Sequence, residues 1–461
     1  MSNWKPDSWR EKKVIQVPQY DDVEDFNKAM VELSQLPPLV TSWEIEKLRQ
    51  KFTLAEQGKA FILQGGDCAE SFDECTSEMV VNKLKILLQM SLVLTVGIKR
   101  PIIRIGRMAG QYAKPRSEDY ETKDGVTLPS YRGDIINKMG FDEQSRRPDP
   151  NLMIKAYEKS ALVMNFVRAL TEGGFADLHH PENWNLSFMD SSIISEEYHR
   201  IVQSVIDSLE FVEAISDDNS KVQRVSFFSS HEGLHLPYEQ AQTRFLEHRG
   251  GWYNLSTHFP WIGVRTTAPD QAHVEYFRGI RNPVGIKIGT DTDSSHLSLL
   301  LETLNPHNEN GRIALITRFG AEKVEEHLPR LIGIVKKLGA SVTWITDPMH
   351  GNTEKTSNGY KTRNFDKIAQ EILHSIKIHQ ANTSFLGGVH LELSGDHVTE
   401  CIGGAAGLSE SDLSRAYKTQ VDPRLNYEQS LEIAMMIANQ YQSMRRNDGV
   451  QSKLSGLPET K

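Results

Sequence analysis

The chain has 461 residues, of which 38% are hydrophobic and 25% charged, a composition typical of a globular protein with a large core. Its net charge of −9 argues against a nucleic-acid-binding surface over the whole molecule. No stretch approaches the roughly 18 uninterrupted apolar residues of a membrane span, residues 1–13 contain no apolar segment, and three cysteines are too few for a disulfide scaffold. We therefore expect a cytoplasmic protein without a membrane or nucleic-acid partner.

Residues 1–55 precede the first predicted strand. Helical spacing over Val23–Leu36 and Ser42–Phe52, separated by the Pro37-Pro38 break, predicts a helical N-terminal extension. Apolar spacing cannot distinguish burial within the chain from burial against a partner subunit. We expect the extension to pack in one of these two ways.

Eight short apolar runs follow. They are Phe61–Leu63, Pro101–Ile105, Val222–Phe228, Trp261–Gly263, Val284–Ile288, Ile313–Thr317, Ser341–Thr346 and Leu386–Leu393. Residues suited to anion or metal chemistry stand at or near the ends of these runs: Cys68, Arg107, Glu232, Arg265, Lys287, Arg318, His350 and Glu392. A barrel of parallel strands gathers such residues at one rim, where the active site lies. The pattern predicts an α/β protein, a (β/α)8 TIM barrel over residues 56–440.

An insert of about residues 114–221 separates the second and third runs. It begins with the loop Lys114–Asp149 and continues with a helix that starts at Asp149-Pro150 and ends at Gly173-Gly174. Apolar residues at helical spacing predict extra helices within about residues 175–216; they are Val202, Val205, Ile206, Leu209 and Val212. Such additions suit regulation or assembly, and equally simple packing. We expect a flexible tail at residues 441–461.

A cationic segment follows the second run. It places Arg107, Lys114 and Arg116 together with Ser117 in eleven residues, and Pro115 keeps the turn extended. Arginine is suited to a bidentate grip on phosphate and lysine to a point-charge contact. Alone, this segment is more typical of a solvated surface loop.

Lys287 is harder to explain as a surface residue. Alternation along Val284–Ile288 sends its side chain into the barrel, where an unpaired ammonium costs several kcal/mol. The same argument applies to Arg265 and Arg318 if they face inward. We recognise no matching set of carboxylates on the strands. The compensating charge is therefore expected from phosphate-bearing substrates.

Possible metal ligands share the same barrel end. Alternation places His390 and Glu392 in the lumen, and Cys68, His350 and Asp422 follow strands. Such a mixed set of sulfur, nitrogen and oxygen donors suits a borderline divalent ion such as Mn²⁺, Fe²⁺, Co²⁺ or Zn²⁺. A lone cysteine or histidine is more often a core residue, so the metal interpretation depends on their shared location.

Ten motifs make the chain resemble the type II, plant-like 3-deoxy-D-arabino-heptulosonate 7-phosphate (DAHP) synthases. They are QGGDCAE (64–70), IGRMAGQYAKPRS (105–117), LPSYRGD (128–134), SHEGL (230–234), WIGVRT (261–266), NPVGIKIG (282–289), DPMHGNT (347–353), HLE (390–392), VTEC (398–401) and DPRLN (422–426). They span nearly the whole chain in the family's order. The resemblance implies condensation of phosphoenolpyruvate with erythrose 4-phosphate, the first step of the shikimate pathway to chorismate and the aromatic amino acids.

The resemblance also implies roles for individual residues. The metal ligands would be Cys68, His350, Glu392 and Asp422, with Mn²⁺ expected before Co²⁺, Fe²⁺ or Zn²⁺. Phosphoenolpyruvate would bind Arg107, Val264, Arg265, Lys287 and Arg318. Erythrose 4-phosphate would bind Lys114, Pro115, Arg116 and Ser117. The expected catalytic residues are Lys287, Glu232 and Arg107.

One position departs from the family pattern. Val264 stands where many relatives have glutamate, and we expect it to contribute its backbone N–H. The resemblance further implies aromatic amino acid effectors and a homo-oligomer, either a dimer or a tetramer. The alternatives are another phosphoenolpyruvate-dependent sugar-phosphate condensation, a paralogue in secondary metabolism with the same chemistry, and a non-catalytic regulator. The presence of every expected ligand residue argues against the regulator.

Overall fold

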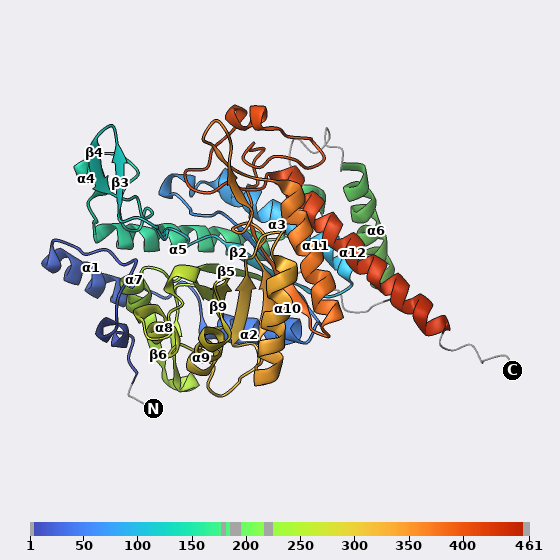
Figure 1. The fold of residues 1–461 in the computed structure, drawn as a ribbon, viewed down its shortest axis with the longest axis horizontal. Coiled ribbons are helices and arrows are strands. Elements are labelled where there is room, and N and C mark those ends of the chain that lie inside the picture. The colour runs from blue at the N-terminus through green and yellow to red at the C-terminus, as the bar shows by residue number, and fades with distance from the viewer. Residues whose placement is uncertain (1–3, 177–180, 185–194, 216–224, 455–461) are drawn as a thin grey trace.

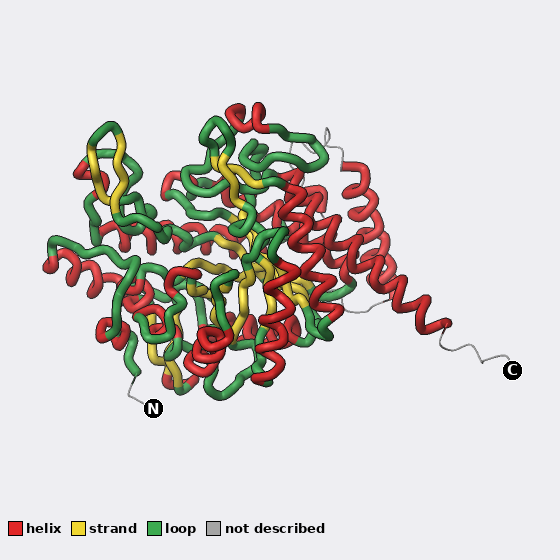
Figure 2. The backbone as a smooth tube through the Cα atoms, viewed as in Figure 1, coloured by secondary structure: helices red, strands yellow, loops and turns green. Residues whose placement is uncertain are grey.

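The computed structural model describes residues 4–176, 181–184, 195–215 and 225–454. Eight parallel strands close into a barrel in which each strand pairs with its neighbours in chain order (Figures 1 and 2). The strands are β1 (Phe61–Gly66), β2 (Ile102–Arg107), β5 (Phe227–Glu232), β8 (Phe259–Ile262), β9 (Val284–Ile288), β10 (Ile313–Thr317), β11 (Thr343–Thr346) and β14 (Leu386–Glu392). This confirms the predicted (β/α)8 barrel. The third strand begins later than expected, at Phe227, and residues 222–224 lie outside the described part.

Helices connect the strands and cover the outside of the barrel (Figure 1). They are α3 (Ser77–Ile98), α5 (Asn151–Glu172), α6 (Ser195–Ile215), α7 (Leu236–Ala241), α8 (Ala272–Phe277), α9 (Ser294–Leu304), α10 (Val324–Leu338), α11 (Phe365–Ala381) and α12 (Tyr427–Leu454). The outward side chains of β9, Val284, Ile286 and Ile288, belong to the apolar layer between strands and helices. Their alternation with Lys287 is as the sequence predicts.

The N-terminal extension closes the amino end of the barrel. Helix α2 (Ser42–Glu56) begins with a capping box between Thr41 and Glu44. Its residues Leu48 and Phe52 are fully buried in one cluster with barrel residues such as Ile316. Helix α1 (Val23–Gln35) packs on α5 and α7. The sequence left open whether these helices pack on the barrel or on a partner subunit. In the structure both helices pack within their own chain.

The insert contains a structure that the sequence interpretation missed. The expected loop Lys114–Asp149 includes a hairpin of β3 (Tyr120–Lys123) and β4 (Val126–Pro129) and a short helix, α4 (Glu143–Arg146). Asp124 and Gly125 have φ values of 52° and 81°, which suit a two-residue turn. The hairpin projects away from the barrel (Figure 1). Helices α5 and α6 match the two predicted insert helices.

Two further hairpins lie outside the barrel sheet. They are β6 (Thr243–Leu246) with β7 (Gly251–Asn254), and β12 (Thr353–Lys355) with β13 (Lys361–Arg363). The second hairpin stands between β11 and α11, so it brings residues of β13 to the carboxyl end of the barrel.

Helices α3 and α12 pack against each other. A Cβ at Gly97 would lie 2.1 Å from the Cβ of Ala438, so only glycine allows this close approach. Helix α3 is long and apolar enough to cross a membrane, but 67% of its most apolar window is buried, as in a core helix. Helix α12 continues to Leu454, so residues 441–454 are helical where we expected a flexible tail, and 455–461 lie outside the described part.

Candidate active site

A cavity of about 450 Å³ lies at the carboxyl ends of the barrel strands. It is lined by all but one of the residues that the sequence predicts for the site: Cys68, Arg107, Lys114, Pro115, Arg116, Ser117, Glu232, Arg265, Lys287, Arg318, His350, Glu392 and Asp422. The exception is Val264, which begins a short 3-10 turn and is absent from the described lining. The barrel thus brings together residues that are up to about 350 positions apart in the sequence.

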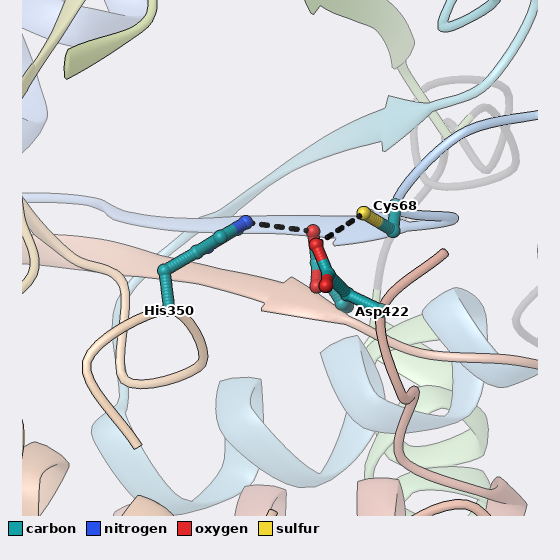
Figure 3. A group of neighbouring side chains, drawn as sticks. Cys68, His350 and Asp422 are labelled. Atoms are coloured by element: carbon teal, nitrogen blue, oxygen red, sulfur yellow. Dashed lines mark hydrogen bonds and ion pairs between the residues drawn. The ribbon is translucent and has the colours of Figure 1, made fainter. Parts of the chain in front are cut away.

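Four potential metal ligands converge in this cavity. One donor atom from each of Cys68, His350, Glu392 and Asp422 lies within 4.8 Å of the other three. Figure 3 shows Cys68 and His350 approaching from opposite sides, with Asp422 beside them. The Sγ of Cys68 lies 3.4 Å from Oδ2 of Asp422, and Nε2 of His350 lies 3.1 Å from Oε1 of Glu392. This sulfur, nitrogen and oxygen set fits a borderline divalent ion.

The protonation of this group follows from its surroundings. Burial, reinforced by Glu392, raises the pKa of Cys68 to about 12, so its thiol is protonated at neutral pH until a cation stabilises the thiolate. Burial opposes ionisation of Asp422 as well, but Lys114 more than compensates and lowers its pKa. Glu392 is ionised for the same kind of reason, because His350 and Arg363 lower its pKa against the effect of burial.

Lys114 lies beside the potential metal ligands rather than free in the cavity. Its Nζ is 2.7 Å from Oδ2 of Asp422 and 3.1 Å from Sγ of Cys68. These contacts raise the pKa of Lys114 even though burial opposes the charge. Lys361 of β13 contacts the other oxygen of Asp422 at 3.2 Å. The loop of Lys114–Ser117 and the four potential metal ligands are therefore parts of one electrostatic unit.

Lys287 enters the barrel lumen, as alternation predicts, but it is paired. Its Nζ lies 2.9 Å from Oδ2 of Asp347, which also lies 2.7 Å from Nδ1 of His350. His350 and Lys287 lower the pKa of Asp347 far enough to overcome its burial. Because Nδ1 faces Asp347, Nε2 is directed at Glu392 and the other donors. A carboxylate that orients a metal-binding histidine in this way also fixes its tautomer.

Arg107 is almost completely buried and joins two parts of the site. Its guanidinium donates to Oε1 of Glu392 at 3.0 Å, to the carbonyl of Cys68 at 3.2 Å and to Nε2 of His390 at 2.7 Å. Since arginine can only donate, His390 carries its proton on Nδ1 and donates to Oε1 of Gln64 at 2.8 Å. Burial, together with Lys287 and Arg107, lowers the pKa of His390 and keeps it neutral.

Among the carboxyl groups predicted for the site, Glu232 forms no ion pair within the described part of the chain. Burial raises its pKa, although Lys287 and His350 oppose that rise, and its Oε1 has no hydrogen-bond partner within the described protein. The backbone of Gly263 lies against it, and a Cβ there would meet Oε1 at 2.0 Å. Glycine at this position therefore makes room for the carboxyl group. A buried acid with a raised pKa is suited to proton transfer.

The expectation that no carboxylates match the cations is wrong. Asp347 pairs with Lys287, Glu392 with Arg107 and Asp422 with Lys114. The error arose because residues considered as metal ligands, and the strand-end residue Asp347, also serve as ion-pair partners.

Two cations in the cavity differ from these pairs. Arg265 and Arg318 form no ion pair with any carboxylate in the described ranges. Arg265 is exposed and donates to Oγ of Ser117 at 2.8 Å. Arg318 is half-buried, and its Nε is buried without a partner in the same described part. Capacity for a substrate anion is therefore concentrated at these two residues.

Buried polar groups connect the loops that carry the potential metal ligands Cys68 and Asp422. Arg424 donates to Oδ1 of Asp67 at 2.7 Å and to Oε1 of Glu400 at 2.9 Å. Asp67 precedes Cys68 and Arg424 follows Asp422 by two residues, so this bridge connects the two ligand-bearing loops. Such supporting contacts set the positions of metal ligands.

Glu70 holds the loop that follows β2. Its carboxylate accepts hydrogen bonds from three consecutive backbone N–H groups, those of Ala109, Gly110 and Gln111, at 2.8–3.0 Å. Gln111 in turn accepts a hydrogen bond from the N–H of Glu232 at 2.8 Å. The loop between Arg107 and Lys114 is thereby tied to the loop that follows β1 and to the end of β5.

Some residues of the site were missed by the sequence interpretation. Asp347 stands directly at the end of its strand, and that position could have identified it. Arg363 of β13 is fully buried and lies 2.7 Å from Oε2 of Glu392. Because β13 belongs to a hairpin outside the barrel rhythm, no periodic signal marks Arg363.

Comparisons with known proteins identify the family of the chain. The model of the class-II DAHP synthetase family matches residues 4–438. A phospho-2-dehydro-3-deoxyheptonate aldolase of Neurospora crassa is 46% identical over 98% of both chains. An enzyme of the same name from Streptomyces coelicolor is 44% identical over 94% of this chain and 96% of its own. The aldolase AroG of Mycolicibacterium smegmatis is 42% identical over 94% and 93%. The chain belongs to the class-II DAHP synthetase family.

Proposed function

We propose that this protein condenses phosphoenolpyruvate, erythrose 4-phosphate and water to give DAHP and phosphate, the first step of the shikimate pathway. The observation that carries the proposal is one cavity with four convergent metal donors and two cations that lack a carboxylate partner among the described residues. Family membership over nearly the whole chain supports the same reaction.

The metal would be held by Cys68, His350, Glu392 and Asp422. Mn²⁺ is our first choice, with Co²⁺, Fe²⁺ and Zn²⁺ as alternatives, since the donor set is mixed. When bound, such an ion supplies Lewis-acid polarisation of the aldehyde of erythrose 4-phosphate. Asp347 and Arg363 pair with His350 and Glu392, and would support the orientation of these two ligands.

Phosphoenolpyruvate would bind at Arg265 and Arg318, with Lys287 and Arg107 beside it. The carboxylate and phosphate of phosphoenolpyruvate would be the anionic partners of these two unpaired arginines. Trp261 also lines the cavity, and its ring centroid is 5.3 Å from the guanidinium of Arg107. Val264 would contribute through its backbone alone, because its side chain carries no polar group.

Erythrose 4-phosphate would bind the loop of Lys114, Pro115, Arg116 and Ser117. The hydrogen bond from Arg265 to Ser117 makes this loop a neighbour of the phosphoenolpyruvate subsite. The two substrates would thus be held side by side with their relative orientation fixed, which lowers the entropic part of the barrier.

The reaction forms a carbon–carbon bond from C3 of phosphoenolpyruvate to the aldehyde carbon. Water then adds at C2, and phosphate leaves from the resulting hemiketal. Lys287 lies where it can stabilise negative charge and transfer a proton, because its ammonium faces both Asp347 and the cavity. Glu232 is the second proton-transfer group, since its raised pKa favours the protonated acid.

The additions to the barrel would serve regulation and assembly. In this proposal residues 1–55 and the insert at 114–221 form the extra surfaces around a catalytic domain of residues 56–440. Aromatic amino acids would act as effectors and a homo-oligomer, dimer or tetramer, as the functional unit in the cytoplasm. Activity measured with Trp, Tyr, Phe and chorismate, singly and together, tests this part, and an indifferent enzyme would contradict it.

The decisive experiment measures phosphate release from the two substrates. We expect EDTA to abolish release and Mn²⁺ to restore it. Arabinose 5-phosphate in place of erythrose 4-phosphate should give little release; a preference for the pentose would identify the alternative condensation.

Two cysteine variants test the proposed metal ligand. Cys68→Ser should lower metal affinity and turnover together, by at least about 100-fold, because it replaces a thiolate donor. Cys75→Ser is the matched control, since Cys75 contacts Tyr112 instead of the ligand group. Full turnover of Cys68→Ser without added metal would remove Cys68 from the proposed site.

A further inference from the structure

The N-terminal strap, residues 4–20, runs from α8 to the loop of Lys114–Ser117. We call this loop the sugar-phosphate loop, after its proposed ligand. The indoles of Trp4 and Trp9 donate to the carbonyl of Glu275 at 2.9 Å and to Oε1 of Gln240 at 3.0 Å. Lys13 bridges to the start of α8, where its carbonyl accepts a hydrogen bond from Ala272 at 3.1 Å. These contacts fix the first part of the strap on the barrel.

The far end of the strap is anchored as well. The hydroxyl of Tyr20 lies 2.9 Å from Nε2 of His235, at the beginning of α7. The residues between Lys13 and Tyr20 are therefore held at both ends. Gln16 lies within this span.

Gln16 makes a reciprocal contact with the sugar-phosphate loop. Its Nε2 donates to the carbonyl of Arg116 at 2.9 Å, and its Oε1 accepts the N–H of the same residue at 2.9 Å. Oε1 also accepts from Nη1 of Arg132 at 3.2 Å. Arg132 and Lys114 are joined through their backbones at 2.8 Å. One carboxamide therefore connects Arg116 and Arg132, on either side of the β3–β4 hairpin, to the strap.

The backbone of Gln16 supports a specific role for its side chain. Its φ of 62° lies in the left-handed region, which costs a residue other than glycine roughly 1 kcal/mol. Such a conformation persists where the surrounding contacts require it. Here it directs the carboxamide towards Arg116.

We propose that Gln16 is a positioning residue of the sugar-phosphate subsite, through which the N-terminal extension sets the affinity for the phosphorylated aldehyde. The inference rests on the proposed assignment of Arg116 to erythrose 4-phosphate. The side chain of Arg116 is engaged by Glu121 of the β3–β4 hairpin, whereas Gln16 holds its backbone. Phosphate binding then requires only a side-chain movement, because the loop beneath it is already fixed.

Steady-state kinetics on the full-length enzyme test this role. Gln16→Ala should raise KM for erythrose 4-phosphate roughly tenfold, as expected for lost hydrogen bonds, while KM for phosphoenolpyruvate and kcat stay unchanged. Gln16→Gly should give the same KM change, because it relieves the backbone but also lacks the carboxamide. Gln16→Glu retains the acceptor but turns a carboxylate oxygen towards the carbonyl of Arg116, so its KM for erythrose 4-phosphate should rise at least as much as that of Gln16→Ala.

The matched control is Gln19→Ala, since Gln19 is exposed in the same strap. It should leave both KM values and the thermal midpoint unchanged. A thermal midpoint of Gln16→Ala equal to that of Gln19→Ala separates positioning from a loss of stability. Equal increases in both KM values, or no increase in either, would overturn the inference.

Arg116→Ala separates this inference from the function on which it rests. It should raise KM for erythrose 4-phosphate, and adding Gln16→Ala should cause no further change, because both act through one loop. If Arg116→Ala leaves KM unchanged, the assigned subsite is wrong. If Arg116→Ala raises KM and Gln16→Ala does not, the subsite stands and the role of Gln16 is wrong.

Discussion

The two ends of the barrel are built from the same strands but differ in chemistry. At the amino end, Phe52 and Leu48 of α2 close the lumen with apolar side chains that are fully buried. At the carboxyl end, the lumen holds Lys287, Arg107 and Glu392 in a network of buried ion pairs. Burial of apolar surface stabilises the fold, whereas buried charges cost free energy unless they are paired. Stability and reactivity are therefore separated along the barrel axis.

This separation explains why the cations are paired unequally. Lys287 and Arg107 lie deep in the lumen, and each has a carboxylate partner. Arg265 and Arg318 lie nearer the mouth, where solvent reduces the cost of an unpaired charge. Of these four cations, the two deeper ones are therefore neutralised by the protein, whereas Lys361 and Arg116 show that cations nearer the solvent are also paired in places.

The largest expected effect comes from the carboxyl end. Lys287→Met should reduce kcat/KM about 10³-fold, or about 4 kcal/mol, because it removes the proposed proton-transfer group and its charge. Initial rates of phosphate release with both substrates measure it. Lys337→Met, at an exposed position of α10, is the control for replacing a lysine by methionine. A near-normal kcat/KM in a folded Lys287→Met enzyme would show that the chemistry does not use this lysine.

The opposite result is expected at the amino end. Phe52→Ala should lower the free energy of unfolding by about 3–5 kcal/mol, since it leaves a cavity between α2 and the strands. Both KM values should stay within error in the folded enzyme. Urea unfolding measures the loss, and Leu54→Ala, an exposed position on the same helix, should cost less than about 1 kcal/mol. A change in either KM that, converted to free energy, exceeds the loss in free energy of unfolding would contradict the separation of the two ends.

Much of this separation could be predicted from the sequence. Alternation along β9 and β14 places Lys287, His390 and Glu392 in the lumen, and strand order places Cys68, His350 and Asp422 on one rim. These predictions succeed because side-chain direction in a strand has a fixed period of two.

Pairing in three dimensions could not be predicted in the same way. Arg363 reaches Glu392 from a hairpin, and Gln16 reaches Arg116 across a hundred residues of sequence. Neither contact follows from periodicity, because each depends on where a loop or strap lies. The β3–β4 hairpin is different, since its Asp124-Gly125 turn was visible in the sequence and was overlooked.

The smallest expected effect is at Glu371 of α11, which contacts two loops of the carboxyl end. This carboxyl group accepts hydrogen bonds from the N–H of Phe319 at 2.9 Å and from Nδ2 of Asn352 at 2.8 Å, and so holds the loops that carry Arg318 and His350. Burial raises the pKa of Glu371 to about 7, and Asp347 adds to the rise. The folded state therefore binds a proton more tightly than the unfolded state.

The sign of the pH dependence follows from this raised pKa. Its contribution to stability is fully present below the unfolded pKa and is lost as the pH rises to about 7. The free energy of unfolding of wild type minus that of Glu371→Gln should fall by roughly 1–3 kcal/mol between about pH 5 and about pH 8. Urea unfolding over this range measures the difference. Glu302→Gln, at an exposed position of α9, is the control. A difference that stays constant with pH would mean that Glu371 is ionised throughout, and that the loops of Arg318 and His350 are held by a carboxylate.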